Sequence, residues 1–291
     1  MKPVLILLLV AQISLFAKDE VQIETIKINE NIYMLIGDGG NIGLCVGEDG
    51  AFMIDDQYAP LTEKIKGAVS AVSKYPVKFL INTHYHFDHA GGNENFGKTA
   101  AVIVAHENVR TRLSAGQFMK DFDMQVEPTG KPGLPVITFT QNMTFHLNGE
   151  EIQVRHVPRA HTDGDSVIFF KNANVLHTGD IFFNGRYPYF DIHAGGALDG
   201  VIEVTTQLLK EINSETRIIP GHGPLAGKAE LRAYRDMLAD VRNKVMALIN
   251  QDKTLQEVID AAPAAAHAEA WGKRANGFVK LVYNDLIRKR K

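Results

Sequence analysis

The chain alternates between short apolar runs and longer stretches in which apolar residues recur three and four positions apart. The first pattern is typical of buried β-strands and the second of helices that bury one face. In the first half, helical spacing predicts helices over residues 60–72 and 107–113. Short apolar runs between turn-forming residues predict strands at residues 32–36, 43–46, 51–54, 77–82 and 101–105.

The second half of the chain repeats this alternation. Helical spacing predicts helices over residues 201–212, 228–250 and 278–287. Residues 114–135 follow neither period, so we expect a long irregular loop there. Strands are expected at residues 137–139, 143–147, 152–156, 167–170, 175–177 and 217–219.

The N-terminal residues differ from everything that follows. Lys2 precedes an apolar run over residues 4–16, and Ala17 is followed at once by charged residues. This layout predicts a secretory signal over residues 1–17, because the run is shorter than the ~20 residues that a membrane-spanning helix needs. The alternative is an N-terminal membrane anchor. We therefore expect residues 18–291 to form a single exported, periplasmic domain with helices at its C-terminal end.

Composition and charge limit the classes of molecule that this protein is expected to bind. The 291 residues, 45% of them hydrophobic, fit an ordinary globular protein. The formal net charge is −3, and it becomes −4 without residues 1–17, because these hold one lysine and no acidic residue. No basic cluster indicates nucleic-acid binding, so we expect a small-molecule substrate. Cys45 is the only cysteine, so it has no intramolecular disulfide partner, and we expect a buried strand residue rather than a nucleophile.

Candidate metal ligands gather directly after the strand predicted at residues 77–82. His84, His86, Asp88 and His89 lie within six positions. His84 and His86 can face the same side of an extended segment, whereas Asp88 and His89 can turn toward a second ion. Imidazole and carboxylate groups are common zinc ligands, and loops at strand ends expose such side chains. The alternative, a solvated polar loop, does not require this combination of residues.

Three further candidate ligands also follow predicted strands. His161 precedes a Thr-Asp-Gly segment, Asp180 closes a Thr-Gly-Asp segment, and His222 lies in a Pro-Gly-His-Gly segment. Together with the H-x-H-x-D-H run, and in this order, these motifs resemble the metallo-β-lactamase-fold superfamily over residues 21–225. The resemblance implies an α+β fold, the four-layer αβ/βα sandwich of two mixed sheets with helices outside.

The resemblance also implies a role for each candidate ligand. It assigns His84, His86 and His161 to a first metal, Asp88, His89 and His222 to a second, and Asp180 to a bridge between them. Asp55 resembles the acidic residue that braces such a site, a role that Asp56 could share, and His177 is expected to support the site from nearby.

We expect two zinc ions, with iron or manganese as alternatives, because the ligand set mixes nitrogen and oxygen. The implied reaction is a metal-dependent hydrolysis, in which a metal-bound hydroxide attacks a carbonyl-type bond and Asp88 orients the nucleophile and relays its proton.

Departures from known subfamilies leave the substrate open. One lactamase subgroup has cysteine where this chain has Asp180. Glyoxalase II-like thioesterases share the aspartate, but this chain lacks their Cys-Gly-Arg pattern after it, and quorum-quenching lactonases have tyrosine in place of Phe183. A β-lactam is therefore one candidate substrate beside a thioester, a lactone and a phosphodiester. The non-enzymatic alternative is a periplasmic metal-binding or interaction protein.

Two loops are expected to frame the substrate. Residues 182–196 follow Asp180 directly, and residues 114–135 hold several aromatic and methionine side chains. These side chains either line an apolar pocket or pack the loops down, and the sequence favours neither. The candidates for substrate contact are Phe183, Arg186, Tyr189 and His193.

Overall fold

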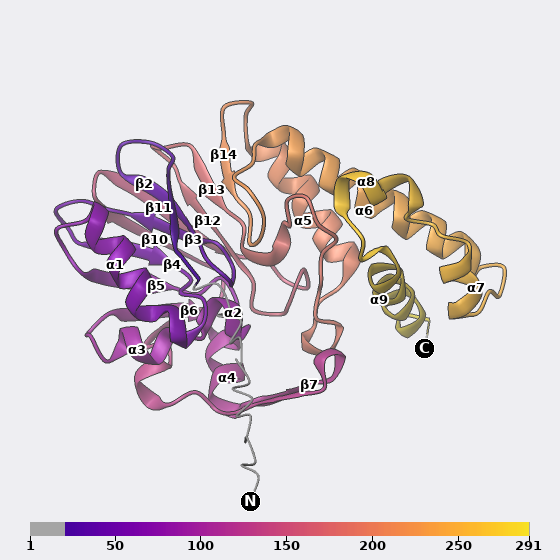
Figure 1. Cartoon of the computed structure of the whole chain (residues 1–291), viewed down its shortest axis with the longest axis horizontal. Coiled ribbons are helices and arrows are strands. Elements are labelled where there is room, and N and C mark those ends of the chain that lie inside the picture. Colours follow the sequence, from indigo (N-terminus) through magenta and orange to yellow (C-terminus); the bar gives the residue numbers. More distant parts are fainter. Residues whose placement is uncertain (1–20, 291) are drawn as a thin grey trace, which may run out of the picture.

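The computed structural model describes residues 21–290, so the predicted signal over residues 1–17 lies outside the described residues. Two mixed sheets lie face to face, and helices cover their outer faces (Figure 1). This four-layer αβ/βα arrangement is the predicted one. Within the described residues, no helix is both long enough and apolar enough to cross a membrane.

The first sheet comes from the N-terminal half. Its order is β1 (Glu24–Lys27), β2 (Ile32–Ile36), β3 (Ile42–Cys45), β4 (Ala51–Ile54), β5 (Val77–Ile81), β6 (Val102–His106) and β9 (Ile137–Phe139). The first four strands form an antiparallel meander, whereas β4, β5, β6 and β9 run parallel. Parallel neighbours need crossover connections. The connecting helices are α1 (Thr62–Val72), α2 (Phe87–Ala90), α3 (Asn93–Gly97) and α4 (Glu107–Ala115).

The second sheet comes from the C-terminal half. Its order is β10 (Asn142–Leu147), β11 (Glu150–His156), β12 (Ser166–Phe170), β13 (Val175–His177) and β14 (Arg217–Ile219). The strands are antiparallel except β13 and β14, which are parallel and joined through α5 (Leu198–Glu211). The chain closes with α6 (Lys228–Ile249), α7 (Leu255–Asp260), α8 (Ala268–Trp271) and α9 (Ala275–Arg288).

Strand β4 illustrates why the sheets are apolar on both faces. Phe52 and Ile54 face the core between the two sheets, and the alternate residues Ala51 and Met53 face the core beneath α1. A strand buried on both faces reads as a continuous apolar run, which is how residues 51–54 appear in the sequence.

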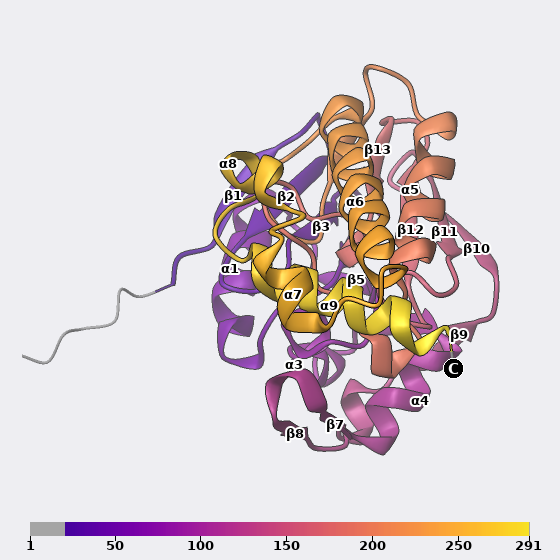
Figure 2. The same ribbon diagram turned by 90° about the vertical axis from the view of Figure 1, so that its right-hand side faces the viewer.

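The C-terminal helices build a further core over the second sheet. Helices α5 and α6 lie side by side, and α9 packs against α6 (Figure 2). The buried side chains of α6 recur at helical spacing, as predicted: Leu231, Tyr234, Leu238, Val241 and Val245. This layer places α9 beside the loops that follow the strands of the second sheet.

The segment over residues 114–135 corrects the sequence prediction of an irregular loop. It contains an antiparallel hairpin of β7 (Gln117–Met119) and β8 (Met124–Val126), with one 3-10 turn between the strands and another after them. Each strand has three residues, too few to show an alternating pattern. Phe118 and Phe122 are 52% and 53% exposed, so they do not pack the hairpin down.

Candidate metal centre

The candidate ligands lie together because the strands that precede them end at one edge of the sandwich. The segment from His84 to His89 follows β5 and leads into α2. His161 follows β11, Asp180 lies in a 3-10 turn after β13, and His222 follows β14. Side chains beyond strand ends are free to converge, because loops rather than ladder hydrogen bonds hold them.

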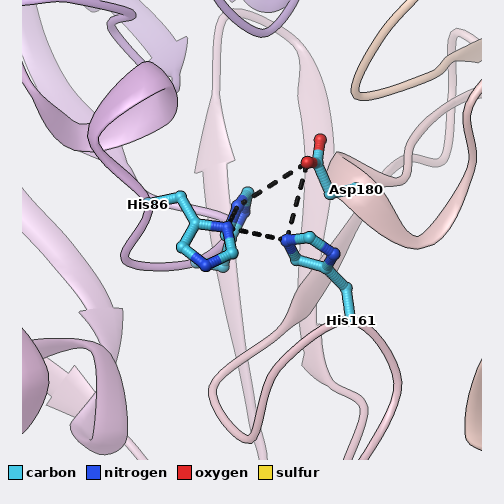
Figure 3. Close-up of side chains that lie close together, drawn as sticks. His86, His161 and Asp180 are labelled. Atoms are coloured by element: carbon cyan, nitrogen blue, oxygen red, sulfur yellow. Dashed lines mark hydrogen bonds and ion pairs between the residues drawn. The ribbon is translucent and has the colours of Figure 1, made fainter. Parts of the chain in front are cut away.

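A first group of four side chains is buried. His86 Nδ1 lies 2.8 Å from His161 Nε2 and 3.1 Å from His84 Nε2. Asp180 Oδ2 lies 3.5 Å from His161 Nε2 and 3.9 Å from His84 Nε2. Figure 3 shows His86, His161 and Asp180 pointing toward one another. The four atoms lie within 4.8 Å of one another, close enough to share one ion.

A second group lies directly beside the first. His222 Nε2 is 3.2 Å from Asp88 Oδ2 and 3.4 Å from His89 Nε2, and His89 Nε2 is 3.6 Å from Asp88 Oδ2. The other carboxylate oxygen of Asp180, Oδ1, lies 2.9 Å from His89 Nε2 and 3.4 Å from His222 Nε2. Asp180 therefore directs one oxygen at each group, which is the geometry of a bridging carboxylate.

Hydrogen bonds on the far side of each ring fix which nitrogen carries a proton. His161 Nδ1 donates to the Tyr189 carbonyl at 2.9 Å, and His89 Nδ1 donates to Asp55 Oδ2 at 2.7 Å. Because a neutral imidazole has one N–H, His161 Nε2 presents a lone pair to the site, and His89 Nε2 does the same once a bound cation has displaced its second proton. This arrangement is typical of metal-bound histidines.

His84 and His86 are held in the same way. His86 Nε2 donates to Asp191 Oδ2 at 3.3 Å, which leaves Nδ1 facing the other histidines. His84 Nδ1 lies 3.0 Å from Thr83 Oγ1, whose own proton goes to Asp55 Oδ2 at 2.7 Å. Thr83 therefore accepts from His84, and His84 Nε2 is left with its lone pair toward the site.

The inward-facing donor atoms fit a cation. The lone pairs of His86 Nδ1 and His161 Nε2 face each other at 2.8 Å, an arrangement that repels unless a positive charge lies between them. Asp180 Oδ1 is buried, and its nearest polar neighbours are His89 Nε2 at 2.9 Å and His222 Nε2 at 3.4 Å. A buried carboxylate oxygen in this position needs either protons on those two rings or a bound cation.

Burial and mutual repulsion keep part of the site neutral. Burial lowers the pKa of His84 well below its usual value, with the charges of neighbouring histidines adding to the effect. Burial likewise lowers the pKa of His161 to about 4. Both rings are therefore uncharged at neutral pH, so their lone pairs are available without loss of a proton.

The second group has the opposite electrostatic balance. Burial opposes the charged form of His89, but the carboxylates of Asp180 and Asp88 outweigh it and raise the pKa of His89 well above its usual value. Burial also opposes the charge on His222, yet Asp180 raises the pKa of that ring to about 9. A cation bound there would therefore replace protons that balance the carboxylates.

Two of the residues expected to support the site do so, Asp55 by contact with a candidate ligand and His177 through the turn that carries one. Asp55 is fully buried and accepts bonds from His89 Nδ1, Thr83 Oγ1 and the Thr83 backbone N–H, each at 2.7 Å. His177 donates from Nε2 to the Asn41 carbonyl at 3.1 Å and accepts at Nδ1 from the Gly179 N–H at 3.1 Å. His177 thus holds the turn that carries Asp180.

Asp56 has a different environment from its neighbour Asp55. Its Oδ1 accepts from the Gly92 backbone N–H at 2.9 Å, and its Oδ2 is buried without a hydrogen-bond partner within the described residues. Burial, above all, raises its pKa well above the usual value. The Asp56 side chain therefore holds the loop before α3, and the Asp56 backbone N–H donates to the His89 carbonyl at 2.8 Å.

Asp191 and Tyr85 are functional candidates that the sequence did not reveal. Asp191 Oδ2 accepts from the Tyr85 hydroxyl at 2.5 Å and from His86 Nε2, and its Oδ1 accepts from two backbone N–H groups. Burial raises the pKa of Asp191, but the bonds from His86 and Tyr85 outweigh it and hold the pKa below its usual value. The only signal was the position of Asp191 in the loop expected to frame the substrate.

The four candidates for substrate contact lie at different distances from the centre. Phe183 stacks on His222 with ring centroids 5.0 Å apart, and the Tyr189 ring lies 6.0 Å from those of His86 and His161. His193 is exposed and lies 3.8 Å from Asp121 of the hairpin. Arg186 is exposed, and among residues 21–290 no hydrogen bond, ion pair or ring contact joins it to the candidate ligands.

Comparisons with known proteins agree with this geometry. A family model for the metallo-beta-lactamase superfamily matches residues 35–222. A hydroxyacylglutathione hydrolase of Nitrosococcus oceani is 26% identical over 232 residues, which cover 79% of this chain and 78% of that protein. A protein of the same name from Pelagibacter ubique is 23% identical over 150 residues, which are 50% of this chain and 52% of that protein, so the chain spans about half of it.

Lactamases are similar to the same degree. A metallo-beta-lactamase type 2 of Elizabethkingia meningoseptica is 24% identical over 237 residues, which cover 78% of this chain and 89% of that protein. A solved metallo-beta-lactamase from Pontibacter korlensis superposes with a TM-score of 0.63 at 19% identity, covering 75% of this chain and 100% of that one, which shows the fold. Because the family model covers well over half of the 291 residues, the chain belongs to the metallo-beta-lactamase superfamily.

Proposed function

We propose that this protein is an exported hydrolase that holds two divalent metal ions, zinc by preference, and cleaves a carbonyl-type bond in a small molecule. The observation that best supports the proposal is the convergence of seven histidine and aspartate side chains in two adjacent groups. Asp180 directs one oxygen at each group, and the far-side nitrogens of His89 and His161 are hydrogen-bonded to Asp55 and to the Tyr189 carbonyl, which leaves their inward-facing nitrogens to bind a cation.

The chain's own residues define the two ion sites. The first would be held by His84 Nε2, His86 Nδ1, His161 Nε2 and Asp180 Oδ2, and the second by Asp88 Oδ2, His89 Nε2, His222 Nε2 and Asp180 Oδ1. Mixed nitrogen and oxygen donors suit zinc, and iron or manganese are the alternatives. Ions bound there would supply Lewis-acid polarisation of the scissile bond and activation of water at neutral pH.

Asp88 is the proton acceptor in this proposal. It is the least buried carboxylate among the candidate ligands, and its Oδ2 faces His222 Nε2 at 3.2 Å. Burial raises the pKa of Asp88, but the charge of His89 and the bond from His222 outweigh it and keep the pKa below its usual value. Asp88 is thus ionised at neutral pH, so its carboxylate is able to take a proton.

The type of bond is supported by the relatives' names. The relatives at 23% to 26% identity include hydrolases of hydroxyacylglutathione and a metallo-beta-lactamase, which favours acyl groups over phosphodiesters. A β-lactam is one substrate of this class, and thioesters and lactones are others. The absence of cysteine at position 180 and of tyrosine at position 183 distinguishes this chain from the subfamilies described above.

The proposal is tested with purified protein comprising residues 18–291. Bound metal is measured by elemental analysis after zinc loading, and turnover is measured with a chromogenic cephalosporin, an S-acyl thioester, a lactone and a phosphodiester. We expect two zinc ions per chain and zinc-dependent cleavage of at least one acyl substrate, lost on chelation. His84→Ala should bind less zinc and cleave that substrate at least about 100-fold more slowly.

His146→Ala is the matched control, because His146 is an exposed histidine on β10 that does not contact the candidate ligands. It should retain both zinc ions and full turnover. Two bound zinc ions without cleavage of any acyl substrate would contradict the reaction class, and failure to bind zinc would contradict the proposed site. Export is tested by mass spectrometry of the periplasmic fraction, where absence of the chain would contradict export and an intact N-terminus at Met1 would contradict cleavage of the signal.

A further inference from the structure

A cavity of about 320 Å³ lies next to the candidate metal centre. Its walls are the tip of the β7–β8 hairpin, the loop that follows Asp180, and one side of helix α9. Figure 1 shows the hairpin extending from the end of α4 toward the side of the molecule where α9 lies. The volume falls within the roughly 300 to 1,000 Å³ that is typical of small-molecule sites.

The floor of this cavity is apolar. Tyr187 and Phe278 are 7% and 3% exposed and stack with ring centroids 5.2 Å apart. Leu281 lies along the same wall, and Phe122 at the hairpin tip contributes a ring that is 53% exposed. An exposed phenylalanine that lines the same cavity as buried aromatic rings provides apolar area that a ligand would cover.

The rim of the cavity carries positive charge. Arg274 and Lys280 line it, and within residues 21–290 neither side chain has an ion-pair or hydrogen-bond partner. By contrast, Arg288 and Lys289 at the other end of α9 both pair with Asp285. Two cations without partners beside an apolar floor favour an anionic ligand.

Among the described residues that line the cavity, the one acidic residue is already engaged. Asp121 Oδ2 accepts from the Tyr189 hydroxyl at 3.0 Å, and its Oδ1 lies 3.8 Å from His193 Nε2. The carboxylate thus joins the hairpin tip to the loop after Asp180, and it does not neutralise Arg274 or Lys280.

Tyr189 connects the cavity with the candidate metal centre. Its ring lines the cavity and contacts Phe122, with ring centroids 5.1 Å apart. The same ring lies 6.0 Å from the rings of His86 and His161, and its carbonyl oxygen accepts the His161 Nδ1 proton. The Tyr189 side chain therefore borders both the cavity and the metal centre. A substrate whose reacting bond lies at the metal centre has this cavity directly beside it.

We propose that this cavity binds the part of the substrate remote from the scissile bond and selects amphipathic anions. An apolar chain or ring covers Phe122, Phe278 and Leu281, and an anionic group such as a carboxylate lies at Arg274 and Lys280. This assignment of substrate class rests on the proposed hydrolase function. The cavity's preference for amphipathic anions is independent of turnover and is measured separately.

The first measurement is binding of 8-anilinonaphthalene-1-sulfonate, a fluorescent amphipathic anion, to zinc-loaded residues 18–291. We expect the Arg274→Ala/Lys280→Ala variant to raise the dissociation constant about tenfold, the size expected for two exposed charge contacts. Lys273→Ala is the matched control, because Lys273 is an exposed neighbour that does not line the cavity. Leu281→Ala should weaken binding through loss of apolar contact. Equal affinities in the double variant and the control would overturn the proposal.

The second measurement compares two esters that differ only at their far end, mono-p-nitrophenyl suberate and p-nitrophenyl octanoate. We expect the wild-type protein to favour the carboxylate-bearing ester in kcat/KM by about tenfold, from the same two charge contacts. The Arg274→Ala/Lys280→Ala variant should lose this preference, and Lys273→Ala should keep it. A preference that survives the double substitution would overturn the substrate class. Cleavage of neither ester would count against the acyl-hydrolase function, and the fluorescence comparison would then decide the cavity alone.

Discussion

Replacing Asp55 with asparagine tests whether the candidate metal centre depends on a carboxylate that itself does not face the ions. Asp55 accepts three hydrogen bonds, from His89 Nδ1, Thr83 Oγ1 and the Thr83 N–H, each at 2.7 Å. Its backbone φ of 62° lies in the left-handed region, which asparagine tolerates better than most residues, so the change adds little backbone strain.

The amide has one acceptor oxygen and two N–H donors where the carboxylate had two acceptors. If its oxygen keeps the Thr83 N–H, its NH2 group faces His89 Nδ1, and His89 must move its proton to Nε2, which removes the lone pair offered to the second ion. If the amide turns over, its NH2 group meets the Thr83 N–H instead. Either conflict leaves a buried donor unpaired, at a cost of about 1–3 kcal/mol.

This cost is the expected loss of zinc affinity at the second group, about 10- to 100-fold. It is measured by competition with a chromophoric chelator, in which the two zinc sites titrate as separate steps. Asp56→Asn is the matched control. Burial raises the pKa of the Asp56 carboxyl well above its usual value. The one hydrogen bond that this side chain accepts, from the Gly92 N–H at 2.9 Å, can be kept by an amide oxygen.

The Asp56 variant should bind zinc within about threefold of wild type, since an isosteric change away from the ligands has little effect. An Asp55→Asn protein with wild-type zinc affinity would refute the proton assignment for His89. Equal losses in both variants would mean that the buried loop, and not the bond to His89, determines the affinity.

Three further substitutions probe the fold and the site. In Gly40→Ala the new Cβ would overlap the His89 ring, so zinc binding at the second group should fall below detection by chelator competition. Full zinc binding would contradict the close contact between Gly40 and the His89 ring. In Gly67→Ala the new Cβ meets open space on α1, so the free energy of unfolding measured in urea should rise by about 1 kcal/mol. A lower free energy of unfolding would refute this expectation. Asp285→Ala leaves the Leu198 N–H at the start of α5 without its acceptor and removes one carboxylate partner from Arg288 and from Lys289, which keep their other contacts. Unfolding should therefore be easier by about 1–3 kcal/mol, and an unchanged midpoint would refute this.

The strands and long helices could be predicted because their burial follows the sequence period. Strand β4 matches its predicted residues 51–54, and α6 ends one residue before the predicted 228–250. The β7–β8 hairpin could not be predicted, because its strands have three residues each and its aromatic side chains face outward. Short helices such as α3 and α8 span four or five residues, little more than one turn, which is also too short for a period.

The candidate site could be predicted where its residues are close in sequence or lie in recognisable motifs. Asp191 has neither property, since its contact with His86 spans 105 positions and depends on how the loop after Asp180 folds back. The same fold-back explains Arg186. Although it is six positions from Asp180, the neighbouring Tyr187 is buried against Phe278 of α9, and Arg186 is left in solvent. Nearness along the chain was therefore a poor guide to nearness in space.

Each candidate ion site takes side chains from both sheets. His161 meets His86 across 75 positions, and His222 meets His89 across 133. Contacts between such distant parts of a chain form slowly, because a long loop must close first. Neither half of the protein can thus assemble an ion site before the two sheets dock. During refolding, uptake of zinc should therefore coincide with the docking of the two sheets. The bound ions would then hold the two separately formed halves together.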